Sequence, residues 1–392
     1  MKRGLGATCL LVLCAILVAG LWPFHAPKNE VSWLSNRSGL LFGDYGSILS
    51  SSEFNMTGSN NRPCSLEIWL QPAATFDSND ILAFSTSQNP LQFAVAQSRD
   101  DLFVLRQFPD AQRRLKGAYI AIDHVFRKDN RLFMTITSGP QGTAVYLDGT
   151  LVKTSPQFVF TGNDFTGELV IGNSPVQNNT WGGQLWGLGI FDRELTAVQV
   201  LQHYDLWTKN QGVELTREPD TRSLYLFNEH AGRVVRNQVP SEPSLYIPED
   251  YFVLHQKFLE PFWQEFRPNW TFGENVILNI VAFIPLGFFF CAYFSSVRAL
   301  NRPGLAAIVL GAAVSLTIEI LQAYLPTRES GTTDIITNTL GSAVGAMLYG
   351  CPAVRVLLSR TGRRTSKQDV SEEPELDMKP VSRVLVEDRL SK

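Results

Sequence analysis

The sequence predicts a mixed fold, in which an antiparallel β-sandwich is combined with an α-helical transmembrane bundle of about four helices. Two observations favour it. Residues 30–250 contain many short runs with alternating apolar positions, and Gly, Asn, Asp and Pro punctuate these runs. Elsewhere, four apolar runs reach the roughly 17–25 residues that a membrane helix needs. We therefore expect a folded domain attached to a bilayer.

Net charge and cysteine content limit the possible partners and covalent links of the chain. The formal net charge of −3 is close to neutral, so nothing favours nucleic acid as a partner. Four of the five cysteines lie in or beside apolar runs, and Cys64 is alone in the sandwich region. No disulfide can form within the sandwich, so its stability has to come from its core, and cysteine usage does not indicate the compartment.

The first apolar run, residues 4–24, follows Lys2 and Arg3 and ends in the aromatic residues Trp22 and Phe24. Its length of about 20 residues suits a transmembrane helix, and aromatic residues favour the membrane interface. We interpret residues 1–29 as a retained N-terminal transmembrane anchor. A cleaved signal peptide is the alternative, because small residues near "LVAG" offer a cleavage point.

Three further apolar runs, at 275–294, 304–325 and 334–351, predict a helical membrane region over 273–353. Basic residues lie between the first two runs and after the last: Arg298, Arg302, Arg355, Arg360, Arg363, Arg364 and Lys367. Cytoplasmic loops carry an excess of Lys and Arg. We therefore expect an integral protein of a bacterial cytoplasmic membrane, with both termini cytoplasmic and residues 30–250 extracytoplasmic.

Two segments flank this membrane region. Residues 251–272 are rich in aromatic residues but interrupted by charge and proline, which predicts an interfacial segment or an ordinary linker. Residues 354–392 are charged and poor in aromatic residues, which predicts a disordered cytoplasmic tail.

Within 30–250, "LDGT" (147–150) predicts a β-hairpin, and "DRELTAVQVLQHY" (192–204) predicts one short helix. The runs "SGLLFGDYG" (38–46), "CSLEIWLQP" (64–72), "AVYLDGTLVK" (144–153) and "ELVIGNS" (168–174), together with residues 181–204, resemble the laminin-G/concanavalin-A-like jelly-roll domains. That resemblance implies a jelly roll of the type that often binds carbohydrate, on an aromatic platform and sometimes with Ca²⁺.

Candidate glycan-binding residues are Trp181, Trp186 and Tyr146, with Trp69 as a further aromatic. The alternative is that these aromatic side chains fill the core. The E-x-D-x-x-E motif of the related glycanases is absent, so we expect no catalysis in this domain. No cofactor is evident, and Ca²⁺ in the β-sandwich is left open.

Polar residues recur at helical spacing within the membrane region, which predicts that they face one another rather than lipid. This membrane polar cluster comprises Asn275, Asn279, Ser315, Glu319, Gln322, Arg328, Asp334 and Asn338. Residues expected at helix contacts are Pro285, Gly287, Gly311, Gly341 and Gly345. Arg328 is available to neutralise Glu319 and Asp334. We predict no metal here: Glu319 and Asp334 could offer carboxylate ligands, but no histidine lies in any span, which disfavours zinc.

The same residues carry a second resemblance. The patterns N-x₃-N-x₃-F-x-P-L-G (275–287), S-x₃-E-x₂-Q-x₃-P-x-R (315–328) and D-x₃-N-x₂-G-x₃-G (334–345) resemble the VanZ-like family of membrane proteins. The resemblance implies a link to glycopeptide (teicoplanin-type) resistance and to the cell envelope. It also implies that the jelly roll is inserted between the first and second helices.

Three functions remain open from the sequence. The first is a cell-envelope protein that binds an extracytoplasmic glycan with its sandwich and a membrane lipid or lipid-linked precursor with its helices. The second is a membrane enzyme that acts on a lipid-linked or polyprenyl substrate through Glu319 or Asp334. The third is a transporter subunit, which would need more helices, supplied by a homodimer through Gly341 and Gly345 of the last helix. Interhelical hydrogen bonding alone is the structural alternative for the polar cluster.

Overall fold

The computed structural model describes residues 2–55, 62–76, 78–109, 115–240, 242–266, 268, 270–296 and 300–354. The predicted tail therefore lies almost wholly outside the described residues, as do Arg298 and the basic residues from Arg355 onward. The chain divides into two compact units. The sandwich unit comprises Leu17–Pro268 and Leu316–Ile335, and the helix unit comprises Met1–Ile16, Asn269–Ser315 and Ile336–Lys392.

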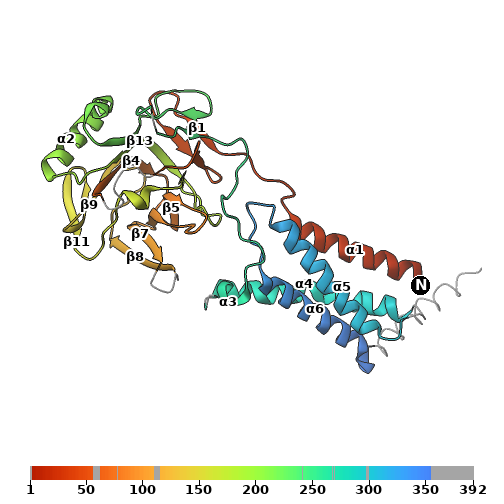
Figure 1. Cartoon of the computed structure of the whole chain (residues 1–392). Coiled ribbons are helices and arrows are strands. Elements are labelled where there is room, and N and C mark those ends of the chain that lie inside the picture. Colours follow the sequence, from red (N-terminus) through yellow and green to blue (C-terminus); the bar gives the residue numbers. More distant parts are fainter. Residues whose placement is uncertain are drawn as a thin grey trace, which may run out of the picture. The chain divides into compact units, whose positions relative to one another are not determined.

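Two antiparallel sheets form the sandwich unit (Figure 1), which confirms the predicted β-sandwich. The first sheet contains β1 (Val31–Trp33), β2 (Leu40–Phe42), β4 (Cys64–Pro72), β9 (Leu132–Gly139), β10 (Gly142–Leu147), β11 (Thr150–Ser155), β13 (Gly183–Phe191) and β14 (Thr221–Tyr225). The second sheet contains β3 (Ile48–Ser50), β5 (Ser78–Ser85), β6 (Phe93–Ser98), β7 (Asp101–Pro109), β8 (Leu115–Ile122), β12 (Glu168–Ile171), β15 (Val234–Val235) and β16 (Leu245–Tyr246). The late strand β14 pairs with β13, so residues 221–225 belong to the first sheet.

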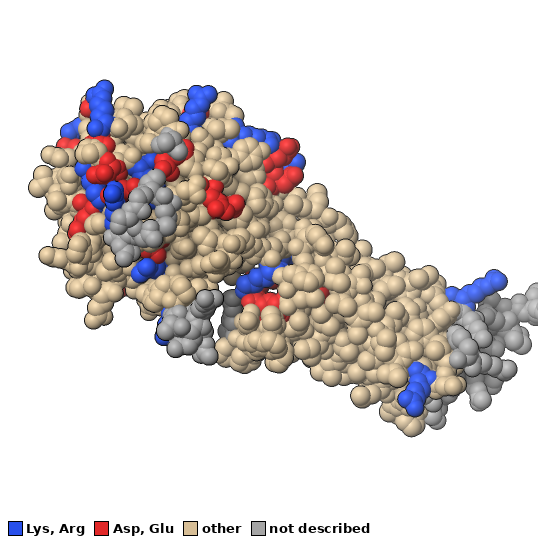
Figure 2. Space-filling view, in the orientation of Figure 1, with Lys and Arg blue, Asp and Glu red and all other residues tan. Residues whose placement is uncertain are grey.

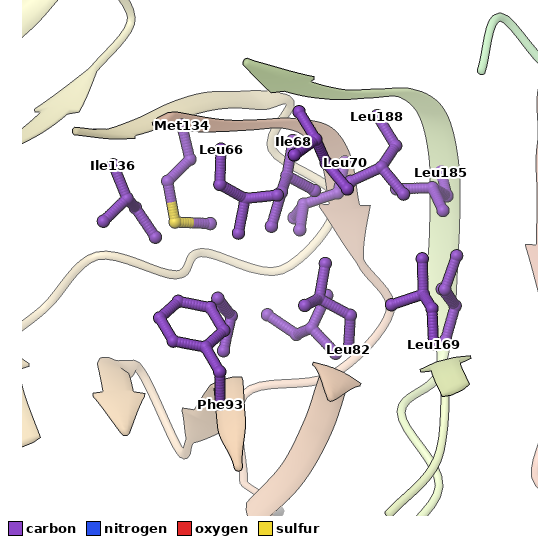
Figure 3. Close-up of a cluster of buried hydrophobic side chains, with 14 of the residues drawn as sticks. Leu66, Ile68, Leu70, Leu82, Phe93, Met134, Ile136, Leu169, Leu185 and Leu188 are labelled. Carbon is purple, nitrogen blue, oxygen red and sulfur yellow. The ribbon is translucent and has the colours of Figure 1, made fainter. Parts of the chain in front are cut away.

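The core lies between the facing surfaces of the two sheets (Figure 3). Leu66, Ile68 and Leu70 alternate along β4, so they all point to one face of the first sheet and are fully buried. Leu82 and Phe93 meet them from the second sheet. Each such side chain stabilises the fold by about 1.5–3 kcal/mol when it leaves water. All five cysteines are free, so this core supplies the stability that a disulfide would otherwise add.

Two local signals in the sequence form as predicted. In the β10–β11 hairpin, Asp148 and Gly149 both have positive φ, of 48° and 77°, as a two-residue type I′ turn requires. The predicted short helix is α2 (Ala197–Thr208), which begins after Thr196. Thr196 and Gln199 each accept a hydrogen bond from the other's backbone N–H, so they form a capping box. Two 3₁₀-helices, η1 (Gly162–Phe165) and η2 (Gly212–Arg217), also lie among the strands of residues 30–250.

A buried ionic network holds α2 on the outer face of the first sheet. Glu67 and His203 are both fully buried. His203 Nδ1 lies 2.9 Å from a Glu67 oxygen, and His203 Nε2 lies 3.0 Å from a Glu218 oxygen. Trp207 donates its indole N–H to the second Glu67 oxygen at 2.9 Å. Only the imidazolium form can donate from both ring nitrogens, so this geometry favours a charged His203.

The helices of the remaining chain are α1 (Lys2–Leu21), α3 (Phe262–Glu265), α4 (Trp270–Ser295), α5 (Pro303–Gln322) and α6 (Thr332–Gly350). Three of them, α1, α4 and α5, are long and apolar enough to cross a membrane. The fourth predicted span forms α6, which is not in this group because Thr, Asn, Ser and Gly dilute its apolar residues. Figure 2 shows charged side chains clustered over the strands, whereas few lie over the long helices on the face in view.

The His203 network predicts a pH-dependent stability. Burial lowers the pKa of His203, but the hydrogen bonds and charges of Glu67 and Glu218 outweigh it and hold that pKa above its ordinary value. The stabilisation is therefore fully present below the ordinary histidine pKa of about 6.5 and is lost as pH rises through the raised pKa. We expect the thermal unfolding midpoint of the detergent-solubilised protein to fall between about pH 6 and pH 9.

His203→Gln is expected to lower this midpoint at about pH 6 and to flatten its pH dependence. His124→Gln is the matched control, because His124 pairs with Asp100 on the surface, where solvent and salt screen such pairs. An unchanged pH profile in the His203 variant would contradict the charged network.

Candidate functional site

A pocket of about 960 Å³ opens on the sandwich unit, with walls from the first sheet, α2 and η2. Its floor is aromatic and its rim carries amides and charged groups. The lining residues are Asn36, Arg37, Ser38, Trp69, Arg131, Asp148, Trp186, Tyr204, Trp207, Thr208, Asn210, Gly212, Val213, Leu226, Asn228 and His230. Concave sites that combine aromatic surface with a few polar groups are typical of small-ligand binding. We call this site the α2 pocket.

Of the predicted glycan-binding residues, Trp186 lies in the α2 pocket, but its ring is covered. The guanidinium groups of Arg37 and Arg131 lie 5.0 and 5.1 Å from its ring centre, and Trp69 packs at 5.4 Å. Only 5% of Trp186 is exposed, so its face is not free to stack on a sugar. Its buried indole N–H has no hydrogen-bond partner among the described residues.

The other two predicted residues are structural. Trp181 is 1% exposed and donates its indole N–H to Gln97 Oε1 at 2.9 Å. Tyr146 is 8% exposed and belongs to the hydrophobic cluster beneath α2, with Phe133 and Trp207. Both side chains pack against neighbouring elements, so neither presents a flat sugar platform. Trp69, which is half-buried in the α2 pocket, is the better placed aromatic residue.

A second group of candidate residues surrounds the N-terminus of α6, within the sandwich unit. Glu319 is 1% exposed, and its carboxylate accepts the backbone N–H of Gly331 at 2.8 Å. The Glu265 carboxylate accepts the backbone N–H of Thr333 at 2.8 Å and the hydroxyl of the same residue. The first N–H groups of a helix have no partner inside the helix and carry partial positive charge. These carboxylates supply the missing acceptors.

Glu265 is a site residue that the sequence analysis missed. It lies in the segment 251–272, which the sequence predicts only as interfacial or linker. The carboxylate lies directly over Gly331, where a Cβ atom would come within 1.3 Å of its oxygen Oε1. The acidic neighbours of Glu319 are Glu265 and Asp334, so three acids gather around one helix end. No spacing rule links residue 265 to residue 331, because the contact depends on the tertiary fold.

The same segment also covers the C-terminus of α5. The Gln256 side chain donates to the backbone carbonyl groups of Leu325 and Arg328, at 2.6 and 3.0 Å, and more weakly to that of Gln322. Glu260 pairs with residues 330–332 through backbone hydrogen bonds on both sides. Residues 255–266 therefore satisfy backbone groups at two helix ends, and we call them the strap.

Arg328 does not neutralise Glu319 or Asp334 as the sequence suggested. Its guanidinium group donates instead to the backbone carbonyl of Trp22, just beyond the end of α1. Gln322 also reaches this end and donates to the carbonyl of Gly20 at 2.7 Å, while its own buried oxygen has no partner among the described residues. Asp334 is half-buried in the first turn of α6.

In the helix unit, Ser315, Asn338 and Ser342 form a small buried polar cluster. The Asn338 side chain donates to the Ser315 hydroxyl at 2.9 Å, and the Ser342 hydroxyl donates to the Asn338 carbonyl at 3.1 Å. The membrane polar cluster thus occurs as two groups, one in each unit. Asn275 is exposed and Asn279 is half-buried.

The predicted glycines lie where helix backbones approach closely. A Cβ atom on Gly341 would lie 2.2 Å from the Ile280 carbonyl oxygen, and one on Gly345 would lie 2.1 Å from that of Ile284. Gly287 and Gly311 make similar approaches to Ser342, whereas Pro285 is exposed. The Gly341 and Gly345 face is therefore occupied by α4 of the same chain. This packing replaces the predicted use of that face in a homodimer.

Potential metal ligands come together once within the described part of the chain. Side-chain atoms of Asp100, Asp101 and His124 lie within 4.8 Å of one another at adjoining turns of the second sheet. His124 already bonds to Asp100, at 2.6 Å, and its ring is largely exposed. Hydrogen bonding accounts for this cluster without an ion, so Ca²⁺ in the sandwich stays a prediction.

Comparison with known families covers both parts of the chain. Residues 223–355 match the family described as VanZ/LLP1, and residues 42–201 match the concanavalin A-like lectin/glucanases superfamily. Residues 223–355 are therefore similar to VanZ proteins, and residues 42–201 are similar to concanavalin A-like domains, as the sequence predicted. The VanZ-type region contains the strap, α4, α5 and α6, so the capped end of α6 is one of its features.

Protein VanZ of Enterococcus faecium is 35% identical over 99 residues, which are 25% of this chain and 56% of that protein. The chain therefore spans little more than half of this curated relative. Among solved structures, a native heptameric SAP-like pentraxin from Limulus polyphemus is 18% identical, with a TM-score of 0.32 over 44% of this chain and 79% of that one. A Bacteroides ovatus protein assigned to carbohydrate binding is 12% identical, with a TM-score of 0.37 over 57% and 60% of the two chains.

Capping by Glu319 predicts a difference between two substitutions. Glu319→Gln keeps an oxygen that can accept the Gly331 N–H, whereas Glu319→Ala leaves that buried group unpaired, at a cost of about 1–3 kcal/mol. We expect the Ala variant to lower the thermal unfolding midpoint and the amount of folded protein in membranes, and the Gln variant to stay close to wild type.

Glu329→Ala is the control, because Glu329 is an exposed acid in the same connection. If the Gln variant folds normally but loses an envelope phenotype, Glu319 has an acid–base role beyond capping. Equal stability of all three variants would remove the capping interpretation.

Close helix packing predicts a second contrast, between two glycines. Gly341→Ala forces a methyl group against the Ile280 backbone, which cannot rotate away, so we expect a lower thermal unfolding midpoint. Gly273→Ala is the matched control, since no atom lies within 4 Å of its added Cβ and alanine favours helix by about 0.5–1 kcal/mol. A Gly341 variant as stable as the Gly273 variant would contradict this packing.

Proposed function

We propose that this protein binds glycans of the cell envelope from an anchored position on the outer side of the cytoplasmic membrane. The sandwich would recognise an envelope polysaccharide or the sugar part of a lipid-linked precursor. The observation that carries the proposal is the α2 pocket, because it combines aromatic surface with hydrogen-bonding groups on a lectin-like domain.

The chemistry of the α2 pocket suits a sugar. The apolar faces of a sugar ring pack on aromatic side chains, and its hydroxyl groups need donors and acceptors nearby. Trp69 and Tyr204 supply aromatic surface, and the amides of Asn36, Asn210 and Asn228 supply both donors and acceptors. This set gives the orientation and specificity that a purely apolar pocket lacks.

The orientation in this proposal comes from the charge pattern of the sequence. Arg302 and Arg298 lie between α4 and α5, and five further basic residues fall within residues 355–367, soon after α6. The positive-inside rule assigns these segments to the cytoplasm and the sandwich to the opposite side. Besides α1, α4 and α5, the three helices that are long and apolar enough to cross a membrane, this assignment requires α6 to cross as the fourth span.

For the VanZ-type region we propose a positioning role. Glu319 already accepts the backbone N–H of Gly331, just before α6, and Glu265 accepts that of Thr333 in its first turn, so both are engaged in holding the start of this helix. This favours an anchoring function over the alternative of an enzyme that uses Glu319 and Asp334 on a lipid-linked substrate. The likeness to VanZ extends the proposal to glycopeptide (teicoplanin-type) susceptibility, which deletion of the gene would then change.

The proposal is tested with spheroplasts that carry the full-length protein and fluorescent envelope polysaccharides, with and without Ca²⁺. We expect binding without permeabilisation, and we expect Trp69→Ala to weaken it by at least about tenfold, which corresponds to about 1.4 kcal/mol. Trp263→Ala is the control, because Trp263 is exposed on α3, outside the pocket.

Binding that appears only after permeabilisation would contradict the orientation. Absence of binding to any envelope polysaccharide, in a protein that unfolds cooperatively, would contradict glycan recognition.

A further inference from the structure

The rim of the α2 pocket carries more positive than negative charge. Arg37 and Arg131 are both exposed at the rim, whereas Asp148 is the acidic residue in the lining. Neither arginine forms an ion pair with a carboxylate of the described residues. Arg37 instead donates to the neutral amide oxygen of Gln184 at 2.7 Å. The pocket therefore holds two guanidinium groups against one carboxylate.

Asp148 is also occupied elsewhere. One of its carboxylate oxygens accepts the backbone N–H of Phe133, on the adjacent strand β9, at 2.9 Å. That bond fixes the turn between β10 and β11, and it directs this oxygen to the backbone rather than to an arginine. Among the described residues, the positive charge at the rim is therefore left without an anionic side chain that forms an ion pair with it.

The two guanidinium groups share one aromatic ring, since both lie about 5 Å from the centre of Trp186. Partial loss of hydration and the positive charge of Arg131 together lower the pKa of Arg37 below its ordinary value. The electrostatic repulsion between the groups has a cost that a bound anion would remove. A pocket built only to cover Trp186 has no need for two like charges.

Trp186 adds a third donor. It lines the α2 pocket, is 95% buried, and its indole N–H has no acceptor among the described residues. A buried N–H without an acceptor costs about 1–3 kcal/mol, so an oxygen atom of a ligand would recover this energy. Two cationic donors and one neutral donor thus line the same pocket.

We infer that the α2 pocket binds an anionic glycan, with Arg37 and Arg131 donating to its charged oxygens and Trp186 donating to an adjacent oxygen. Guanidinium groups match carboxylate and phosphate groups through paired N–H donors, so both a carboxylated sugar and a sugar or polyol phosphate carry the required chemistry. Trp69 would then contact the apolar face of the same unit. The inference rests on the proposed glycan binding and specifies the charge of the ligand.

The test is calorimetric titration of the full-length protein in detergent with three probes. The first is tetragalacturonate, the second is its carboxyl-reduced neutral counterpart, and the third is polyglycerol phosphate. The variants are Arg37→Gln and Arg131→Gln, and Arg127→Gln is the matched control because Arg127 is exposed but does not line the pocket.

We expect an anionic probe to bind and its affinity to fall by at least about tenfold in each pocket variant. Affinity should also fall with added salt, and Arg127→Gln should bind like wild type. Tight binding of tetragalacturonate alone assigns a carboxylated sugar, and tight binding of polyglycerol phosphate alone assigns a phosphate-bearing glycan.

Equal binding of tetragalacturonate and its neutral counterpart, wild-type affinity in both pocket variants, or binding by neither anionic probe would overturn the anionic assignment. In each of these cases the proposed function stands if the envelope polysaccharides still bind through Trp69. Loss of that binding as well would overturn both.

Discussion

A buried carboxylate has to be surrounded by donors, and this constraint explains why acidic residues lie in the apolar parts of this protein. Glu67 meets His203 and Trp207 beneath α2. Glu319 meets a backbone N–H at the start of α6. An unpaired charge in either place would cost several kcal/mol, more than a single core side chain contributes. The elements that bring the donors, α2 in one case and the loop before α6 in the other, are thereby fixed in position.

The requirement that a buried charge has a partner also distinguishes the two candidate sites, the acids around the start of α6 and the α2 pocket. Around α6, the acids are engaged by backbone groups, so their arrangement is explained by the fold itself. At the α2 pocket, positive charge is in excess. Within the described chain no acidic side chain forms an ion pair with Arg37 or Arg131. A polar or charged group whose hydrogen-bond or ion-pair partners all lie inside the protein is explained by a structural role. A polar or charged group that lacks a partner at an open pocket is the stronger evidence for a bound ligand.

The sequence predicted features that depend on neighbours in the chain. The Asp148–Gly149 turn, the short helix α2 and the long apolar helices all follow from residues within one or two turns of each other. It could not predict contacts that depend on how distant segments meet. Glu265 reaches the N-terminus of α6 across 68 residues, and no periodicity relates the two. Trp181 and Trp186 show the same limit, since alternation along a strand does not reveal what covers each face.

The boundary of the VanZ-type match lies inside the sandwich, which constrains how the two regions can be separated. The match begins at residue 223, but β14 pairs with β13, and β15 and β16 extend the second sheet. Residues 27–29 also bond to residues 249–251 through backbone groups, so the first and last parts of the domain lie side by side. Adjacent ends are what insertion of a domain between two helices requires, because the chain can leave and return without separating them. A sandwich cut at residue 223 would lose three strands and expose the edge of β13, whereas a cut outside residues 27–251 would keep both sheets whole.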